Sequence, residues 1–168
     1  MLVHKRVFKT LFFLIFFVII GLIKNFRKNF RKVVRLLEYG IQVGLNSTIE
    51  TIVEEKDLAV TYGSGSVRVL ATPAMISLME KAAMFSVELH LPGDKATVGT
   101  NIAVKHLRPT PLGMKIRIYA ELINIDNRRL TFKVEAYDEV EKIGEGTHER
   151  YIIDVDKFME KCENKLNR

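Results

Sequence analysis

Cysteine is almost absent from this chain. Cys162 is the only one among 168 residues, which excludes an internal disulfide and a cysteine-rich metal site. The four histidines do not have the spacing of paired metal ligands, and the sequence has no internal repeat or low-complexity tract. We therefore expect neither a metal ion nor another cofactor.

Acidic residues are missing from residues 1–36, which contain nine lysines and arginines. The formal net charge of +6 is therefore distributed unevenly along the chain. Subtracting those nine from the 26 basic residues leaves 17 against 20 acidic ones, so residues 37–168 carry a net charge of about −3. That part lacks the basic character of a nucleic-acid-binding domain, and we expect no nucleic-acid partner.

A fully apolar run long enough to cross a bilayer is also lacking. The run at residues 11–23 has 13 residues, whereas a spanning helix needs about 20. Residues 7–26 approach that length if Lys9 and Lys24 extend their amines to the interface. Basic residues are denser after the run, so the positive-inside rule places residues 27–168 in the cytoplasm. The interpretation is a signal anchor that tethers a cytosolic domain.

An alternative is that translation begins near Leu37, at a non-AUG leucine codon. The basic, phenylalanine-rich composition ends abruptly there, where the globular pattern starts. The domain would then be cytoplasmic without a tether, and the intact mass of the natively expressed protein distinguishes the two cases. In either case the sequence divides into an N-terminal segment, 1–36, and a domain, 37–168.

Residues 37–168 have the pattern of an α+β domain. The segments MKIRIYAEL and RLTFKVEAYD alternate apolar and polar residues, which indicates strands with one buried face. The short polar stretches DNRR and DEVEK predict tight reversals and antiparallel pairing. TVGTNIAVKHL is largely apolar, as a central strand would be, while STIETIV and DLAVTYG read as short strands or extended segments. One long helix, from Thr72 to about His90, would cover one face of this sheet.

The predicted helix contains an isolated carboxylate, Glu80, in the stretch ATPAMISLMEKAAM. Desolvating an unpaired carboxylate costs several kcal/mol, roughly, so a buried acid is usually paired, protonated or functional. A helical wheel gives a core stripe and, beside Glu80, a second apolar face that would contact another subunit. The alternative is an exposed glutamate next to Lys81. The core stripe is Met75, Leu78, Ala82 and Phe85, and the second face is Ile76, Ala83, Met84 and Val87.

Two further residues are ambiguous when considered alone. Thr72 precedes Pro73 and fits an N-cap. A helix N-terminus also offers free N–H groups to a developing oxyanion, so a catalytic role is compatible with the cap. His106 ends an apolar strand just before LRPTPLG and could be an ordinary surface residue.

Three stretches together resemble the fluoroacetyl-CoA thioesterase-like family, which has the hotdog fold. They are ATPAMISLMEKAA, VGTNIAVKHLRPTPLG and IGEGTHERYIIDVDKF, within residues 67–158, and GTHER is the most specific piece. The resemblance implies one long helix wrapped by a five- or six-stranded antiparallel sheet. It also implies a homodimer, or a larger homo-oligomer, with the helices near the interface.

The resemblance further implies an active site. Thr72, Glu80 and His106 match the catalytic trio of the family, and Gly99 and Arg150 match positions that contact the substrate. Glu80 would attack the thioester carbonyl or activate water, and His106 would shuttle the proton. Thr72 would position the carboxylate.

One departure from the family bears on the substrate. The fluoroacetyl-CoA enzyme has lid phenylalanines shortly before its threonine, whereas this chain has TYGSGSVRVLAT, with no aromatic residue nearer than Tyr62. We therefore interpret the protein as a short-chain acyl-CoA thioesterase and leave open whether fluoroacetyl-CoA is a substrate. The alternative is a non-catalytic acyl-CoA-binding module. A hotdog hydratase is a weaker possibility, because its Asp/His arrangement is absent.

Overall fold

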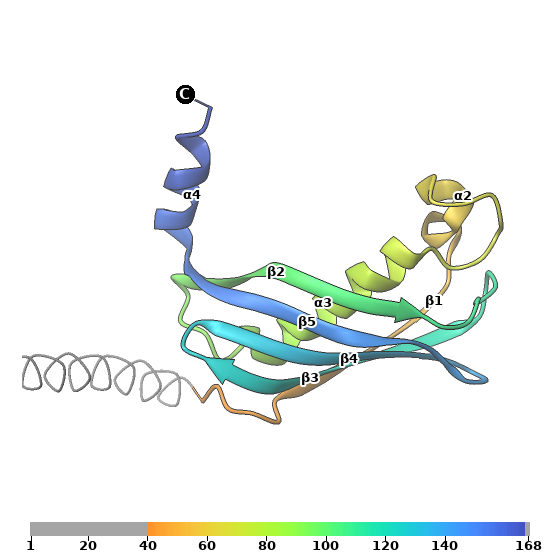
Figure 1. The fold of residues 1–168 in the computed structure, drawn as a ribbon, viewed down its shortest axis with the longest axis horizontal. Coiled ribbons are helices and arrows are strands. Elements are labelled where there is room, and N and C mark those ends of the chain that lie inside the picture. Colours follow the sequence, from red (N-terminus) through yellow and green to blue (C-terminus); the bar gives the residue numbers. More distant parts are fainter. Residues whose placement is uncertain (1–39, 167–168) are drawn as a thin grey trace, which may run out of the picture. The chain divides into compact units, whose positions relative to one another are not determined.

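The computed structural model describes residues 40–166, in which one long helix lies across one face of a five-stranded sheet (Figure 1). The fold class predicted from the sequence is confirmed. In chain order the elements are β1 (Asn46–Ile52), η1 (Glu55–Asp57), α2 (Ala59–Tyr62), α3 (Thr72–Glu88), β2 (Lys95–His106), β3 (Lys115–Asp126), β4 (Arg129–Asp138), β5 (Lys142–Asp154) and α4 (Val155–Glu163).

The strands follow the order β1-β3-β4-β5-β2, and all neighbouring strands are antiparallel. The predicted alternation in β3 and β4 is confirmed, because one set of side chains is buried against α3 while the other is more exposed. The tight reversal between them has Asn127 at φ 57°, a left-handed conformation that asparagine tolerates better than most residues. The buried set is Ile116, Ile118, Ala120 and Leu122 in β3, and Leu130, Phe132, Val134 and Ala136 in β4.

Strand β2 lies at an edge of the sheet, so its prediction as a central strand is wrong. It pairs with β5 only, and none of its residues is fully buried. Its register against β5 shifts between Gly99 and Asn101, which makes Thr100 a bulge. Because of this bulge, Gly99 and the even-numbered residues from Ile102 to His106 pair with residues on the same face of β5.

Helix α3 begins one residue earlier than an N-cap at Thr72 would allow. The cap is Ala71, Thr72 is the first helical residue, and no side chain caps the helix. The predicted N-cap role of Thr72 is therefore wrong. Pro73 fits the first turn, where its missing N–H has no helical acceptor.

The buried face of α3 also differs from the predicted stripe. Phe85 is 44% exposed, whereas Ala83 and Val87, next to Glu80, are completely buried within this chain. The apolar surface beside Glu80 is therefore partly a contact with the chain's own sheet, and the prediction that Ala83 and Val87 contact another subunit is wrong. The buried side chains of α3 are Ala74, Met75, Met79, Ala82, Ala83, Ser86 and Val87.

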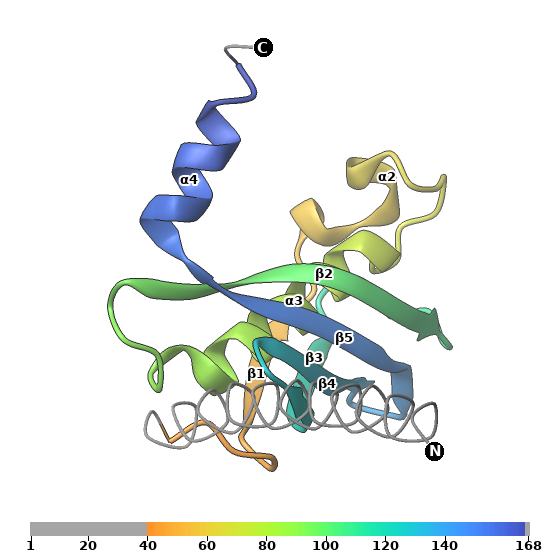
Figure 2. The ribbon, with the colours of Figure 1, turned by 60° about the vertical axis from the view of Figure 1, so that its left-hand side comes forward.

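Two helical segments lie outside this core. The stretch DLAVTYG, predicted as extended, contains the one-turn helix α2, which ends at Gly63 with φ 69°. At the other end of the domain, α4 projects from the end of β5 away from the sheet (Figures 1 and 2). None of the helices in the described range has the length and hydrophobicity of a membrane-spanning segment. The predicted anchor at residues 7–26 lies outside the described residues.

Candidate active site

Thr72 and His106 lie together at one end of α3. Thr72 Oγ1 and His106 Nδ1 are 2.9 Å apart and form a hydrogen bond. The threonine comes from the first turn of α3 and the histidine from the last position of β2. The hydroxyl that the sequence assigns to the helix cap is therefore bonded to a ring 34 residues away.

The environment of His106 favours its neutral form. Burial lowers the pKa of His106 below the usual range, and a backbone contact with Arg108 only partly opposes this. The second ring nitrogen, Nε2, is buried without a hydrogen-bond partner among the described residues. A neutral imidazole with one nitrogen held by Thr72 can accept or deliver a proton through the other.

A surface groove opens beside this pair. It has a volume of about 420 Å³ and contains both Thr72 and His106. The loop before α3 contributes Ser64, Gly65 and Val67, and the segment after β2 contributes Leu107 to Pro109. The glycine- and serine-rich stretch where the resembled family has its lid therefore forms one wall of the groove.

Glu80 lies in a second cluster, further along α3. An ideal Cβ placed on Gly99 would be 3.3 Å from Glu80 Oε1 and 3.2 Å from His148 Cε1. The half-buried carboxylate, the backbone of β2 and a histidine ring of β5 therefore meet at one point. Glycine at 99 allows this close approach because it has no side chain.

Arg150 belongs to the Glu80 cluster and is 94% buried, with a relative exposure of 6%. Its Nε donates to Thr97 Oγ1 at 2.8 Å, and its Nη2 donates to the Thr97 carbonyl oxygen at 2.9 Å. Its Nη1 donates to His148 Nε2 at 3.2 Å and, more weakly, to the Glu80 carbonyl oxygen at 3.4 Å. The chain's own acceptors therefore engage all three guanidinium nitrogens.

The predicted site residues thus form two clusters within one chain. Thr72 and Glu80 are separated by eight helical residues, which corresponds to roughly 12 Å along α3. Gly99 and His106 lie roughly 20 Å apart along β2. The trio Thr72, Glu80 and His106 does not converge on one point in a single chain.

His148 is a member of the Glu80 cluster that sequence reasoning did not assign to the site. It is 1% exposed and lies between Asn101 of β2 and Arg150 of its own strand. The available signal was its place in GTHER, two residues before the arginine that was assigned. A strand places residues two apart on the same face, so this spacing makes them neighbours.

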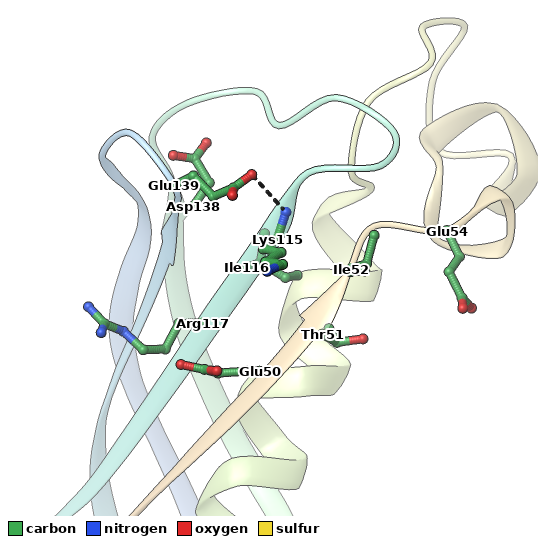
Figure 3. A pocket seen from close by; sticks show the side chains of 9 residues that line it. All are labelled: Glu50, Thr51, Ile52, Glu54, Lys115, Ile116, Arg117, Asp138 and Glu139. Atoms are coloured by element: carbon green, nitrogen blue, oxygen red, sulfur yellow. Dashed lines mark hydrogen bonds between the residues drawn. The ribbon is translucent and has the colours of Figure 1, made fainter.

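A separate groove of about 640 Å³ is lined by the paired strands β1 and β3 near the turn that follows β4 (Figure 3). Glu50, Thr51 and Ile52 line it from β1, and Lys115 to Arg117 line it from β3. The backbone N–H of Lys115 donates to Glu139 Oε2 at 3.3 Å across its end. None of the five predicted site residues lines this groove, so it has no part in the candidate site.

Comparison with protein families gives a match over residues 53–156 to the family described as fluoroacetyl-CoA-specific thioesterase. A fluoroacetyl-CoA thioesterase from Streptantibioticus cattleyicolor is 40% identical over 97 residues, which cover 58% of this chain and 70% of that protein.

Solved structures give the same result for the fold. A structure of the fluoroacetyl-CoA thioesterase FlK superposes with a TM-score of 0.70 at 34% identity, covering 74% of this chain and 97% of that one. A hot-dog-like protein from Thermanaerovibrio acidaminovorans has a TM-score of 0.70 at 19% identity, covering 74% and 93% of the two chains. The latter likeness concerns the fold alone.

Proposed function

We propose, from the premise that this chain belongs to the fluoroacetyl-CoA-specific thioesterase family, that it hydrolyses short-chain acyl-CoA thioesters. The observation that carries the proposal is the bonded Thr72–His106 pair at the edge of an open groove. A half-buried histidine whose neutral form is favoured, beside space for a ligand, is suited to proton transfer.

We further propose that the complete site forms between two chains. Within one chain Glu80 lies too far from His106 to act on the same carbonyl carbon. Strand β2 connects the two clusters and has a free edge, because it pairs only with β5. An exposed strand edge is a template for pairing with another chain, and a second copy of β2 is a suitable partner.

Two-fold symmetry would bring the two clusters together. If the axis passes near Ala103, antiparallel pairing of the two β2 strands sets His106 of one chain opposite the Gly99–Thr100 bulge of its partner. Each His106 would then face the Glu80 of the other subunit, and the dimer would contain two equivalent sites. The proposed homodimer would therefore be required for activity, because each site takes His106 from one chain and Glu80 from the other.

In this composite site the reaction follows from the two clusters. Glu80 attacks the thioester carbonyl or draws a proton from a water molecule that attacks it. The C–S bond then breaks, and His106 delivers a proton to the departing CoA sulfur. If Glu80 is the nucleophile, water then hydrolyses the acyl–Glu80 anhydride, which releases the acid, and His106 takes up a proton from that water; if Glu80 is the base, it returns its proton to His106. Thr72 orients the imidazole, since it is bonded to that ring and lies far from its own Glu80. Gly99 leaves room for the substrate beside the carboxylate.

Ala103→Glu should disrupt the proposed dimer. Ala103 is exposed on β2, so the substitution leaves the fold of one chain intact. Two carboxylates would meet across the axis, where like charges on paired strands are destabilising. Light scattering should show a monomer, and kcat/KM should fall at least tenfold. Ala103→Ser, which adds no charge, is the control. An Ala103→Glu protein that is dimeric and fully active would rule out pairing through β2.

Thiol release from a panel of acyl-CoAs tests the function itself. We expect the full chain to release CoA from acetyl-, propionyl- and butyryl-CoA, with fluoroacetyl-CoA as the comparison for the missing aromatic lid. Acyl-CoA binding without any thiol release would favour the alternative, a non-catalytic binding module.

The same panel of acyl-CoAs, run on protein lacking residues 1–36, should give rates equal to those of the full chain. Membrane fractionation of the two forms tests the proposed tether at residues 7–26.

A further inference from the structure

The ring of His148 is held by a hydrogen bond at each nitrogen. Its Nδ1 lies 2.8 Å from the backbone oxygen of Asn101 on β2. Its Nε2 lies 3.2 Å from Nη1 of Arg150. The ring is 1% exposed, and its centroid is 6.4 Å from that of Phe132 on β4. A buried polar side chain with both positions satisfied is fixed in orientation.

These two contacts determine where the proton of His148 lies. A carbonyl oxygen can only accept, so Nδ1 carries the hydrogen, and a guanidinium can only donate, so Nε2 is the acceptor. Burial, together with the charge of Arg150, lowers the pKa of His148, and the carbonyl of Asn101 and the charges of Glu80 and Glu149 only partly oppose this. His148 is therefore a neutral acceptor for Arg150.

The Arg150 guanidinium is fixed by Thr97 on one side and His148 on the other. Burial lowers the pKa of Arg150, while the negative charges of Glu80 and Glu88 oppose that effect. Arg150 Nη1 also donates to the Glu80 carbonyl oxygen at 3.4 Å, which ties the guanidinium to this turn of α3, although none of the ion pairs within 4.0 Å in the described chain joins the two side chains. A cation that lies near a carboxylate without forming an ion pair with it stabilises the negative charge and leaves free the oxygens that must react.

We infer that His148 is a positioning residue for hydrolysis: it holds the Arg150 guanidinium in place, and the fixed guanidinium in turn orients and stabilises the Glu80 carboxylate. The inference rests on the proposed function of Glu80. It gives Arg150 a task in addition to the substrate contact implied by the family resemblance, since the chain's own acceptors engage four of its five N–H groups. The imidazole itself does not need to touch the substrate.

A pair of amide substitutions separates this role from a purely structural one. The amide oxygen of His148→Gln can reach the position of Nε2 and accept from Arg150. The shorter His148→Asn places its amide near Nδ1, where it bonds to the Asn101 carbonyl but leaves Arg150 without its acceptor. Both replace the ring by an amide, so similar losses of stability are expected. Only the Asn variant should release the guanidinium.

We expect His148→Asn to lower kcat about tenfold with KM changed less than twofold, and His148→Gln to stay within about threefold of wild-type kcat. Thr97→Val, which removes the acceptor of Arg150 Nε without touching His148, should lower kcat several-fold in the same way. Thr147→Val, at an exposed neighbour of His148, is the control and should leave kcat unchanged. Equal kcat values in the Asn and Gln variants would overturn the inference.

A spectroscopic measurement keeps the test independent of turnover. In isotope-labelled full-length protein, the Nη1–H resonance of Arg150, assigned through its loss in Arg150→Lys, should exchange slowly with solvent because His148 Nε2 accepts from it. His148→Asn should accelerate that exchange at least tenfold, and His148→Gln should not. If the wild type released no thiol from any acyl-CoA, the proposed function would fail, while this measurement would still decide whether His148 positions Arg150. Slow exchange in the Asn variant would show that it does not.

Discussion

Glu80→Gln is expected to lower kcat by roughly two to four orders of magnitude, the scale of a lost acid–base or nucleophilic group. The amide preserves the shape of the side chain and removes its charge. Stability should change little, because neutralising a half-buried carboxylate also removes a desolvation cost. His106→Ala should lose a comparable factor, and the double variant should lose little more, since groups that act as a unit are not additive. Thiol release with the best acyl-CoA measures all three.

Mixing these two variants tests whether the site is shared between chains. A heterodimer of one Glu80→Gln chain and one His106→Ala chain, purified through two different tags, would contain one site with both substitutions and one with neither. It should recover about half of the wild-type rate per dimer. If each site were built from a single chain, both sites would be damaged and no activity would return. Wild-type turnover by the Glu80→Gln homodimer would make Glu80 a structural acid and favour the binding-module alternative.

Gly146→Ala should lower the free energy of unfolding by about 3 kcal/mol, because the added methyl group would clash with the neighbouring strand. An ideal Cβ at this position of β5 would be 2.1 Å from the Ala103 carbonyl oxygen and 2.8 Å from the Val104 Cα. Both atoms belong to the backbone of the paired strand β2, so relief requires the two strands to separate. Thermal unfolding should show a Tm lower by roughly 10 °C.

Gly93→Ala is the matched control for that stability change. Gly93 has no atom within 4 Å of its ideal Cβ and does not need a left-handed conformation. The expected change is within about 0.5 kcal/mol. If Gly146→Ala were as stable as this control, β2 could shift relative to β5 at little cost, and the fixed register assumed for the composite site would no longer hold.

Local periodicity predicted the elements that have one apolar face. Apolar and polar residues alternate in β3 as far as Leu122 and in β4 as far as Ala136, so the buried apolar set that includes Ile118 and Phe132 follows from the sequence alone. The order of strands in the sheet depends on tertiary contacts, and no local sequence pattern comparable to this alternation indicates it. An apolar edge strand such as β2 resembles a central one when the helix and, as proposed, a second subunit cover it.

The chemistry of the site was predictable in part. The resemblance pointed to Thr72, Glu80 and His106, but their separation into two clusters depends on the lengths of α3 and β2. The hydroxyl of Thr72 was assigned to the helix cap from its local sequence. Its true partner, His106, lies 34 residues away, and a local pattern cannot indicate that bond. His148 required knowledge of which carbonyl of β2 lies beside which residue of β5, and no local pattern encodes that register.

The extra residue in β2 has a consequence for how related sequences align. Because Thr100 bulges out of the ladder, the glycine and the histidine on this strand are seven positions apart and still share a face. A regular strand would need an even spacing to achieve the same result. A homologue that lacks the bulge residue would have its glycine and histidine six positions apart. Both groups would then still lie on the same face of the strand. A loss of one residue between Asn101 and His106 would instead turn one of the two away.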